Sequence, residues 1–475
     1  MANIAGRLDE MEIFEQLLQS RQAEFVAITG RRRVGKTFLI RNYFKSRIVF
    51  DCSGLHEQSQ PLQLENFRDV LKNSQQKSKA IDVPQTWLQA FNLLKQHITG
   101  IKGKNKKVIF LDELPWFETP RSGFKAALDN FWNNWCSTRD DIILIICGSA
   151  ASWMVKHIIN DRGGFHNRVT RQINLQPFTL AETKMFLKQN RVTLNDYDIL
   201  QLYMVLGGIP FYLKEVKPGN SVAQVIDELF FQKNSIFQNE FNNLYASLFT
   251  NYRWHELVVQ ALASKDRGLT RAEIISITKL SSGGGLSVVL DELEQSGFIS
   301  IHVPFEKLKK ETVYRLRDEF SLFYFKFLHN NKKTAGWLQK AGQQSFKIWC
   351  GHAFENVCLK HTVQIKKALG IQGIYTQEAS WLNKGTKTQP GAQIDLLIDR
   401  ADNCINICEI KFYNTAFEIT KQYAEQLQQK IAVFEQNTKS RKNVFITMIT
   451  TYGTIANAHK LSVVTNEVTM ASLFM

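Results

Sequence analysis

The chain has 475 residues, of which 44% are hydrophobic and 22% charged, with a formal net charge of +15. This length exceeds what one hydrophobic core can serve, so we expect three or four globular domains. No apolar run reaches the roughly 18 residues that a membrane span needs, and the start MANIAGRLDE lacks the features of a signal peptide. Seven scattered cysteines indicate reduced thiols rather than a disulfide framework. We therefore expect a cytoplasmic protein with no membrane segment.

The basic balance favours a polyanionic partner, which we expect to be nucleic acid, and DNA before RNA. A basic proteome would give the same excess, so charge alone does not decide the point.

Four β-rich runs alternate with helical-length segments in residues 1–175. The runs lie in FVAIT, FKSRIVFDCSG, KKVIFLDE and DIILIICGSA. Buried strands separated by helices are typical of a parallel α/β sheet. The fold class that we expect is therefore multidomain α/β, beginning with a parallel-sheet domain.

The first run leads into a complete phosphate-binding motif of the form G-x-x-x-x-G-K-[ST]. Its glycines allow backbone N–H groups to surround phosphates at a helix N-terminus. We expect Lys36 to reach the β- and γ-phosphates of ATP and Thr37 to bind Mg²⁺. The residues predicted to hold the nucleotide are Gly30, Arg31, Arg32, Arg33, Val34, Gly35, Lys36 and Thr37.

Two later strands end in polar residues that complete such a site. Asp112 ends the buried run VIFLD and is predicted to help hold the Mg²⁺ ion. Glu113 follows as the candidate base that orients the attacking water. Ser149, at the end of IILIICGS, is a candidate sensor of the γ-phosphate, although Gly-Ser is also ordinary turn chemistry.

Several motifs in order resemble the archaeal-type ATPases of the STAND branch of the AAA+ superfamily. They are GRLDEMEIFEQLL, ITGRRRVGKTFLI, LDELPWF, CGSAASWM, GGFHNRVTRQINLQPFTLAE and LGGIPFYL. The resemblance implies that Gly6 and Arg7 lie against the nucleotide base and that Pro210 belongs to a nucleotide-sensing lid. It also implies an arginine finger, for which Arg168 is the candidate and Arg171 its rival, and hence a homo-oligomer.

The middle of the chain is predicted to hold a helical lid, residues 176–245, and a winged helix, residues 246–325. In the second, LTRAEIISITKLSSGGGLSVVLDELEQSGFISIHVP has the order helix, turn, helix and hairpin. The predicted recognition helix carries Asp291, Glu292 and Glu294, which repel phosphates. We therefore favour a scaffolding winged helix over one that reads DNA.

Residues 326–475 are predicted to form a second α/β domain. QIDLLID and INICEIKF are β-rich runs that can pair and bring Asp395 and Glu409 together, with Lys411 on the same face as Glu409. Two carboxylates can hold Mg²⁺ or Mn²⁺, and a lysine can orient a water or stabilise a phosphorane. This D…E-x-K pattern, with Glu355 in the preceding helix as a further ligand, resembles nucleases of the PD-(D/E)XK class, although E-x-K also occurs on solvated strand edges.

Two functions compete. In the first, an ATPase is fused to a metal-dependent DNA endonuclease. In the second, the chain is a nucleotide-dependent signalling switch whose winged-helix and C-terminal domains bind nucleic acid or protein without cleaving it.

Overall fold

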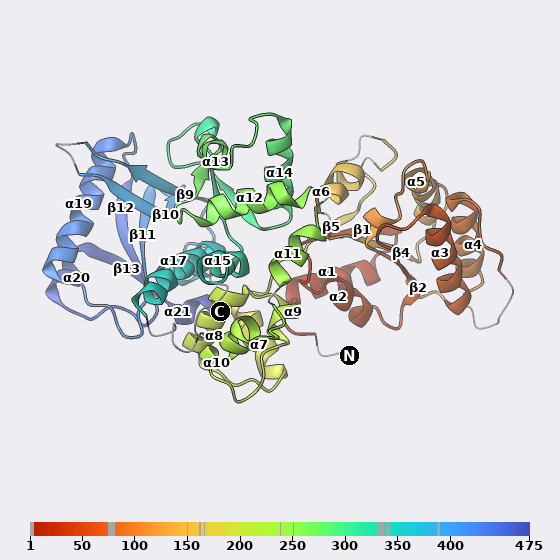
Figure 1. The fold of residues 1–475 in the computed structure, drawn as a ribbon, viewed down its shortest axis with the longest axis horizontal. Coiled ribbons are helices and arrows are strands. Elements are labelled where there is room, and N and C mark those ends of the chain that lie inside the picture. The colour runs from red at the N-terminus through yellow and green to blue at the C-terminus, as the bar shows by residue number, and fades with distance from the viewer. Residues whose placement is uncertain are drawn as a thin grey trace. The chain divides into compact units, whose positions relative to one another are not determined.

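The computed structural model describes residues 4–74, 81–149, 151–160, 163–165, 167–237, 239–249, 251–329, 337, 343–386 and 390–475. The chain divides into two compact units, Met1–Pro177 and Phe178–Met475, with elements labelled in Figure 1. Both units combine helices with a sheet, which confirms the multidomain α/β class. The finer domain boundaries expected near residues 246 and 326 stay a prediction.

Unit 1 is built on five strands in the order β2-β3-β4-β1-β5, and every neighbouring pair is parallel. β1, β3 and β4 are buried along their whole length, which explains their uninterrupted apolar sequences. The strands are β1 (Glu24–Thr29), β2 (Ile48–Ser53), β3 (Lys107–Asp112), β4 (Ile142–Cys147) and β5 (Arg171–Asn174). The helices are α1 (Leu8–Gln19), α2 (Lys36–Tyr43), α3 (Gln60–Ser74), α4 (Trp87–Thr99), α5 (Phe124–Asn134) and α6 (Ala151–Met154).

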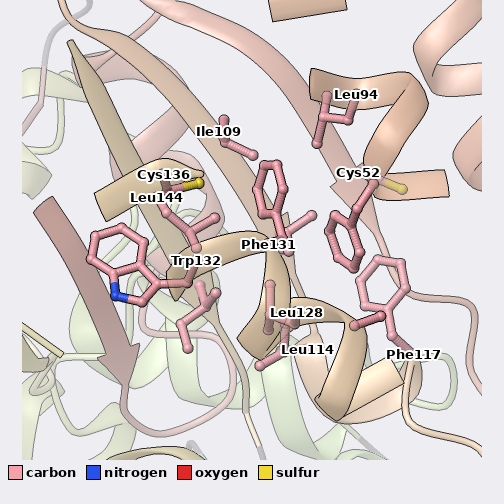
Figure 2. Close-up of a cluster of buried hydrophobic side chains, with 14 of the residues drawn as sticks. Cys52, Leu94, Ile109, Leu114, Phe117, Leu128, Phe131, Trp132, Cys136 and Leu144 are labelled. Carbon is pink, nitrogen blue, oxygen red and sulfur yellow. The ribbon is translucent and has the colours of Figure 1, made fainter. Parts of the chain in front are cut away.

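One face of this sheet packs against α3, α4 and α5 through a large aromatic core. Figure 2 shows part of this core, where Phe131 and Trp132 of α5 lie beside Ile109 of β3 and Leu144 of β4. These side chains are at most 3% exposed, so the sheet is firmly supported from this side. The support holds the carboxyl ends of β1, β3 and β4 in place, where the polar residues of the candidate site lie.

No helix in the described part of the chain is long and apolar enough to cross a membrane.

Unit 2 begins with helices in the residues that were predicted to form the lid. The helices are α7 (Leu180–Gln189), α8 (Asp196–Leu206), α9 (Pro210–Leu213), α10 (Val222–Ile226), α11 (Glu240–Ala246), α12 (Tyr252–Ala263), α13 (Arg271–Thr278), α14 (Gly284–Gln295), α15 (Glu319–Phe327), α17 (Gln344–Lys360), α18 (Thr362–Ala368), α19 (Lys421–Asn437), α20 (Ala458–Val463) and α21 (Met470–Leu473).

Two sheets belong to unit 2. The small one has the antiparallel order β6-β8-β7, formed by β6 (Leu269–Thr270), β7 (Ile299–His302) and β8 (Val313–Leu316). The larger one has the order β13-β12-β11-β10-β9, with β9 to β11 antiparallel and β11 to β13 parallel. Its strands are β9 (Thr376–Asn383), β10 (Ala392–Arg400), β11 (Cys404–Lys411), β12 (Asn443–Thr450) and β13 (Val464–Thr469).

Helices α19 and α17 cover opposite faces of the larger sheet. Ile407 of β11 belongs to the same core cluster as Leu427 and Phe434 of α19. Because side chains alternate along a strand, Cys408 points to the other face, where it lies close enough to Cys358 of α17 to influence its pKa. The two faces of β11 therefore have different neighbours, and this difference decides what its polar residues can do.

Candidate functional site

The phosphate-binding motif forms a loop between β1 and α2. Its backbone takes positive φ angles at Gly30 (135°), Arg33 (75°) and Gly35 (91°). Gly30 has no alternative, since a Cβ there would lie 2.3 Å from the carbonyl oxygen of Leu175. The loop therefore has the tight backbone that the motif predicts, and it ends at the N-terminus of α2, where a phosphate is favoured.

Lys36 closes the loop on itself. Its Nζ donates hydrogen bonds to the carbonyl oxygens of Gly30 (2.9 Å) and Arg31 (3.1 Å), and the residue is 6% exposed. Because both of these acceptors are neutral carbonyls, the charge of the amine favours a nearby anion. The position of this amine suits the predicted contact with phosphate oxygens.

Thr37, Asp112, Glu113 and Ser149 form one connected chain of polar contacts. Thr37 Oγ1 donates to Asp112 Oδ2 (2.7 Å). Glu113 accepts through Oε2 from both the backbone N–H (3.0 Å) and the hydroxyl (2.8 Å) of Ser149. The carboxyl ends of neighbouring parallel strands β3 and β4 thus bring together the metal, base and sensor candidates.

Burial raises the pKa of Asp112, and the charge of Glu113 adds to this effect. Asp112 is 5% exposed, and the Thr37 hydroxyl and the Glu113 N–H, which both donate to its carboxylate, are neutral. A divalent cation here would compensate this buried charge, and a threonine hydroxyl beside a carboxylate is a suitable pair of oxygen ligands for Mg²⁺. The residues present therefore fit the predicted metal.

The arginines predicted for this site differ in their surroundings. Arg7 donates to the carbonyl oxygens of Val34 (3.1 Å) and Gln176 (2.8 Å), directly after Gly6. Arg31 is buried, whereas Arg32 and Arg33 are partly exposed in the loop. Arg168, which follows α6 in the chain, is exposed. Pro210 begins α9 in unit 2.

The predicted E-x-K motif of β11 is engaged by α19. Glu409 accepts a hydrogen bond from the Tyr423 hydroxyl (2.8 Å), and its carboxylate lies 2.5 Å from Lys430 Nζ and 3.0 Å from Lys411 Nζ. Burial by itself would raise the pKa of Glu409, but Lys430 and Lys411 lower it. Glu409 is therefore a buried, charge-compensated anchor for α19.

Asp395 faces the other way. Ile394 and Leu397 both join the core under α19, and a β-bulge lies between them. Asp395, next to Ile394, consequently points to the opposite face. There it accepts from Gln393 (2.8 Å) and lies 3.5 Å from Arg315 Nη2 of β8.

The structure therefore does not bring Asp395, Glu409 and Glu355 together in the way that the predicted metal site requires. Glu355 of α17 lies 3.7 Å from His352 Nδ1, and it raises the pKa of His352 more than Asp395 does. Glu355 and Asp395 thus share a neighbour on one face, while Glu409 lies on the other. Among the described residues, no group of three or more His, Cys, Asp or Glu side chains is arranged to hold a metal ion.

Sequence reasoning missed the partners that decide this outcome, namely Tyr423, Lys430, His352 and Arg315. One signal was present, because Tyr423 and Lys430 are seven residues apart and so lie on one face of α19. Nothing in the sequence indicated which strand they would meet.

Comparison with known proteins agrees with the geometry of unit 1. Residues 5–216 match the family model of an ATPase domain found predominantly in Archaea. The chain therefore contains an archaeal-type ATPase domain with a P-loop, and the matched region includes Pro210.

Two similar proteins extend beyond this domain. An uncharacterized protein of Methanocaldococcus jannaschii, MJECL04, is 23% identical over 393 residues, covering 80% of this chain and 82% of that protein. A Walker-type ATPase of Pyrococcus abyssi has a TM-score of 0.51 at 15% identity, covering 68% of this chain and 97% of that one. The second similarity concerns the fold alone.

Proposed function

We propose that the chain hydrolyses ATP at the P-loop of unit 1 in a Mg²⁺-dependent reaction. The observation that carries this proposal is the connected set Thr37–Asp112 and Glu113–Ser149, which lies at the carboxyl ends of adjacent strands beside the loop. Unconnected polar caps of buried strands would not need this arrangement. The family match of residues 5–216 supports it independently.

Each residue has a distinct role in this proposal. Lys36 exchanges its two backbone carbonyl partners for phosphate oxygens. Thr37 and Asp112 would hold Mg²⁺, which neutralises charge on the phosphates when bound. Glu113 orients the attacking water as general base, and Ser149 positions the Glu113 carboxylate through the two hydrogen bonds described above.

The decisive experiment compares the wild-type chain with Glu113→Gln. We expect wild type to bind ATP by calorimetry in the presence of Mg²⁺ and to release phosphate. Glu113→Gln should retain the affinity and lose about 10²–10³-fold in kcat, because the amide cannot accept the proton. A wild-type chain without measurable ATP affinity would overturn the proposal.

Two finer roles follow from the resemblance to archaeal-type ATPases. Pro210 would belong to a lid that senses nucleotide, and Arg168 would act as a finger in a homo-oligomer, with Arg171 as its rival. The exposure of both arginines supports a role in trans. The test mixes Arg168→Ala or Arg171→Ala chains with Glu113→Gln chains. If the removed arginine is the finger, the Glu113→Gln chain supplies it to the intact Glu113 site of its neighbour, and phosphate release is restored.

For the rest of unit 2 we propose that it binds nucleic acid or a protein without cleaving it. The specific observation is that Lys430 and Tyr423 donate hydrogen bonds to the carboxylate of Glu409, while Asp395 lies on the opposite face of the sheet. A carboxylate used in this way is poorly placed to share a metal with Asp395. The net charge of +15 supports a nucleic acid as the partner.

Residues 246–325 fit a scaffolding winged helix in this proposal. Phe305, in the connection between β7 and β8, donates its N–H to the Ser380 carbonyl of β9 (2.8 Å), and its ring packs near Phe434 of α19. His255 Nε2 lies 2.8 Å from Glu292 Oε2, so one acidic residue of α14 joins two helices. The β7–β8 connection and the acidic helix α14 thus both have contacts within unit 2.

A cleavage and binding experiment separates the two functions. Linear, nicked and single-stranded DNA should be retained without cleavage in Mg²⁺ or Mn²⁺, with and without ATP. Nucleic-acid binding should weaken as salt increases, because it releases counterions from phosphates. Metal-dependent cleavage that disappears in both Asp395→Ala and Glu409→Ala would restore the endonuclease function instead.

A further inference from the structure

Arg7 ties together segments of unit 1 that are far apart in sequence. Its Nη2 donates to the carbonyl of Val34 inside the P-loop, and its Nη1 donates to the carbonyl of Gln176, just before the end of the unit at Pro177. The side chain is 5% exposed, and Glu10 lies 3.6 Å from it. The guanidinium therefore forms a buried connection between the phosphate loop and the segment that leaves unit 1.

The P-loop needs support at this point. Arg33 takes a left-handed φ of 75°, which is unfavourable for a residue with a side chain, and Gly35 follows with a φ of 91°. A trans peptide directs its C=O and its N–H to opposite sides. Because the Val34 carbonyl is directed at Arg7, the N–H of Gly35 is directed away from it. Gly35 caps α2, so this N–H is among the donors that a bound phosphate uses.

The exit segment contacts the loop a second time. Leu175 donates its N–H to the carbonyl of Thr29 (2.9 Å), and its own carbonyl oxygen approaches Gly30 so closely that no side chain fits there. Arg7 thus reinforces an existing contact between the start of the loop and residues 175–176. A change in the loop on nucleotide binding would reach the exit segment by both routes.

We infer that Arg7 is a positioning residue for the phosphates, acting through the Val34 carbonyl, and that it couples the loop to the exit from unit 1. This inference rests on the proposed ATP site. It differs from the base contact that the family resemblance implies, because a positioning residue acts equally on every ligand that carries the polyphosphate. Inorganic tripolyphosphate, which has no base, distinguishes the two roles.

The test measures Mg²⁺-dependent affinity of the full chain for ATP and for tripolyphosphate by calorimetry. We expect Arg7→Ala to weaken both about tenfold. Arg7→Lys should restore part of the affinity, since one ammonium replaces a planar group whose two nitrogens reach two carbonyls. Arg21→Ala, which removes an exposed arginine, is the matched control and should behave as wild type.

A second readout concerns the exit segment. Hydrogen exchange at the Leu175 amide should slow when wild type binds Mg²⁺ and ADP, and this protection should be reduced in Arg7→Ala. Thermal unfolding without nucleotide checks that Arg7→Ala is folded. If it is not, the affinities of Arg7→Lys for ATP and for tripolyphosphate provide the test instead.

The outcomes are distinct. A loss of ATP affinity with unchanged tripolyphosphate affinity would assign Arg7 to the base and overturn the inference, as would unchanged affinity for both ligands. Failure of the wild-type chain to bind either ligand would overturn the proposed ATPase instead.

Discussion

The P-loop of unit 1 and the E-x-K strand of unit 2 both begin as short motifs with the residues of a known chemistry. In unit 1 the fold gathers Lys36, Thr37 and Asp112 around a loop that ends at a helix N-terminus. In unit 2 the fold directs Glu409 to the lysine and tyrosine of α19. A motif in one continuous loop carries its own geometry, whereas a motif divided between strands depends on what the rest of the domain places beside each part.

The largest expected effect separates the two regions directly. Lys36→Ala should weaken ATP binding at least about 100-fold, since charge-assisted hydrogen bonds are worth roughly 1.5–3 kcal/mol each. Calorimetry with Mg²⁺ provides the measurement. Lys45→Ala, which removes an exposed lysine near the end of the same helix region, is the control and should bind normally. Equal ATP affinity in both variants would show that Lys36 does not contact the phosphates.

Glu409→Ala should act on stability rather than on catalysis. It removes the buried carboxylate of Glu409 and leaves Lys430, whose side chain is 21% exposed, without this partner, which costs about 1–3 kcal/mol. We expect the urea unfolding transition of unit 2 to shift to lower concentration while ATP hydrolysis per folded molecule is retained.

Two controls sharpen that result. Glu435→Ala removes an exposed acid from α19 and should leave the transition unchanged. Asp395→Ala should cost less than about 1 kcal/mol, because Asp395 is 26% exposed and its ion pair with Arg315 is long, at 3.5 Å. A large loss in Asp395→Ala matched by a small one in Glu409→Ala would reverse the assignment of the structural carboxylate.

A pH titration examines another buried polar group of unit 2. Burial lowers the pKa of His361 to about 4, and its Nε2 accepts the N–H of Leu180 (3.1 Å), which requires a neutral ring. Between pH 6.5 and 4 the unfolded chain binds a proton that the folded chain does not. The free energy of unfolding should therefore decrease as the pH falls through this window, by up to about 3 kcal/mol.

His361→Gln should make that pH dependence less steep, because glutamine does not titrate, and denaturant unfolding at several pH values is the measurement. The same slope in both chains would mean that another group produces the effect.

The smallest expected effect on ATP turnover belongs to Ser149→Ala. The variant removes one of two donors to Glu113, since the backbone N–H of residue 149 stays. We expect kcat to decrease about tenfold, or about 1.4 kcal/mol, with little change in KM. Steady-state phosphate release measures both constants, and an unchanged kcat would show that Glu113 is positioned without the hydroxyl.

Much of unit 1 could be predicted from the sequence for a local reason. The loop from Gly30 to Thr37 follows a buried strand and precedes a helix. Its residues are contiguous in sequence, so they stay close in space whatever the rest of the fold does. Asp112, Glu113 and Ser149 are farther away, but each ends a buried strand. Parallel strands place such ends at one edge of the sheet.

The sequence by itself determined the α/β class, the phosphate loop and the residues that end β3 and β4, because these follow from apolar runs and contiguous motifs. Only the tertiary structure decided the fate of Asp395 and Glu409. One extra residue in the β10 bulge changes the face to which Asp395 points. No residue type in QIDLLID predicts this bulge. Arg7 depends on the tertiary structure in the same way. It meets Val34 and Gln176 through their backbone carbonyls, which the pairing of β1 with β5 brings near one another whatever the side chains are.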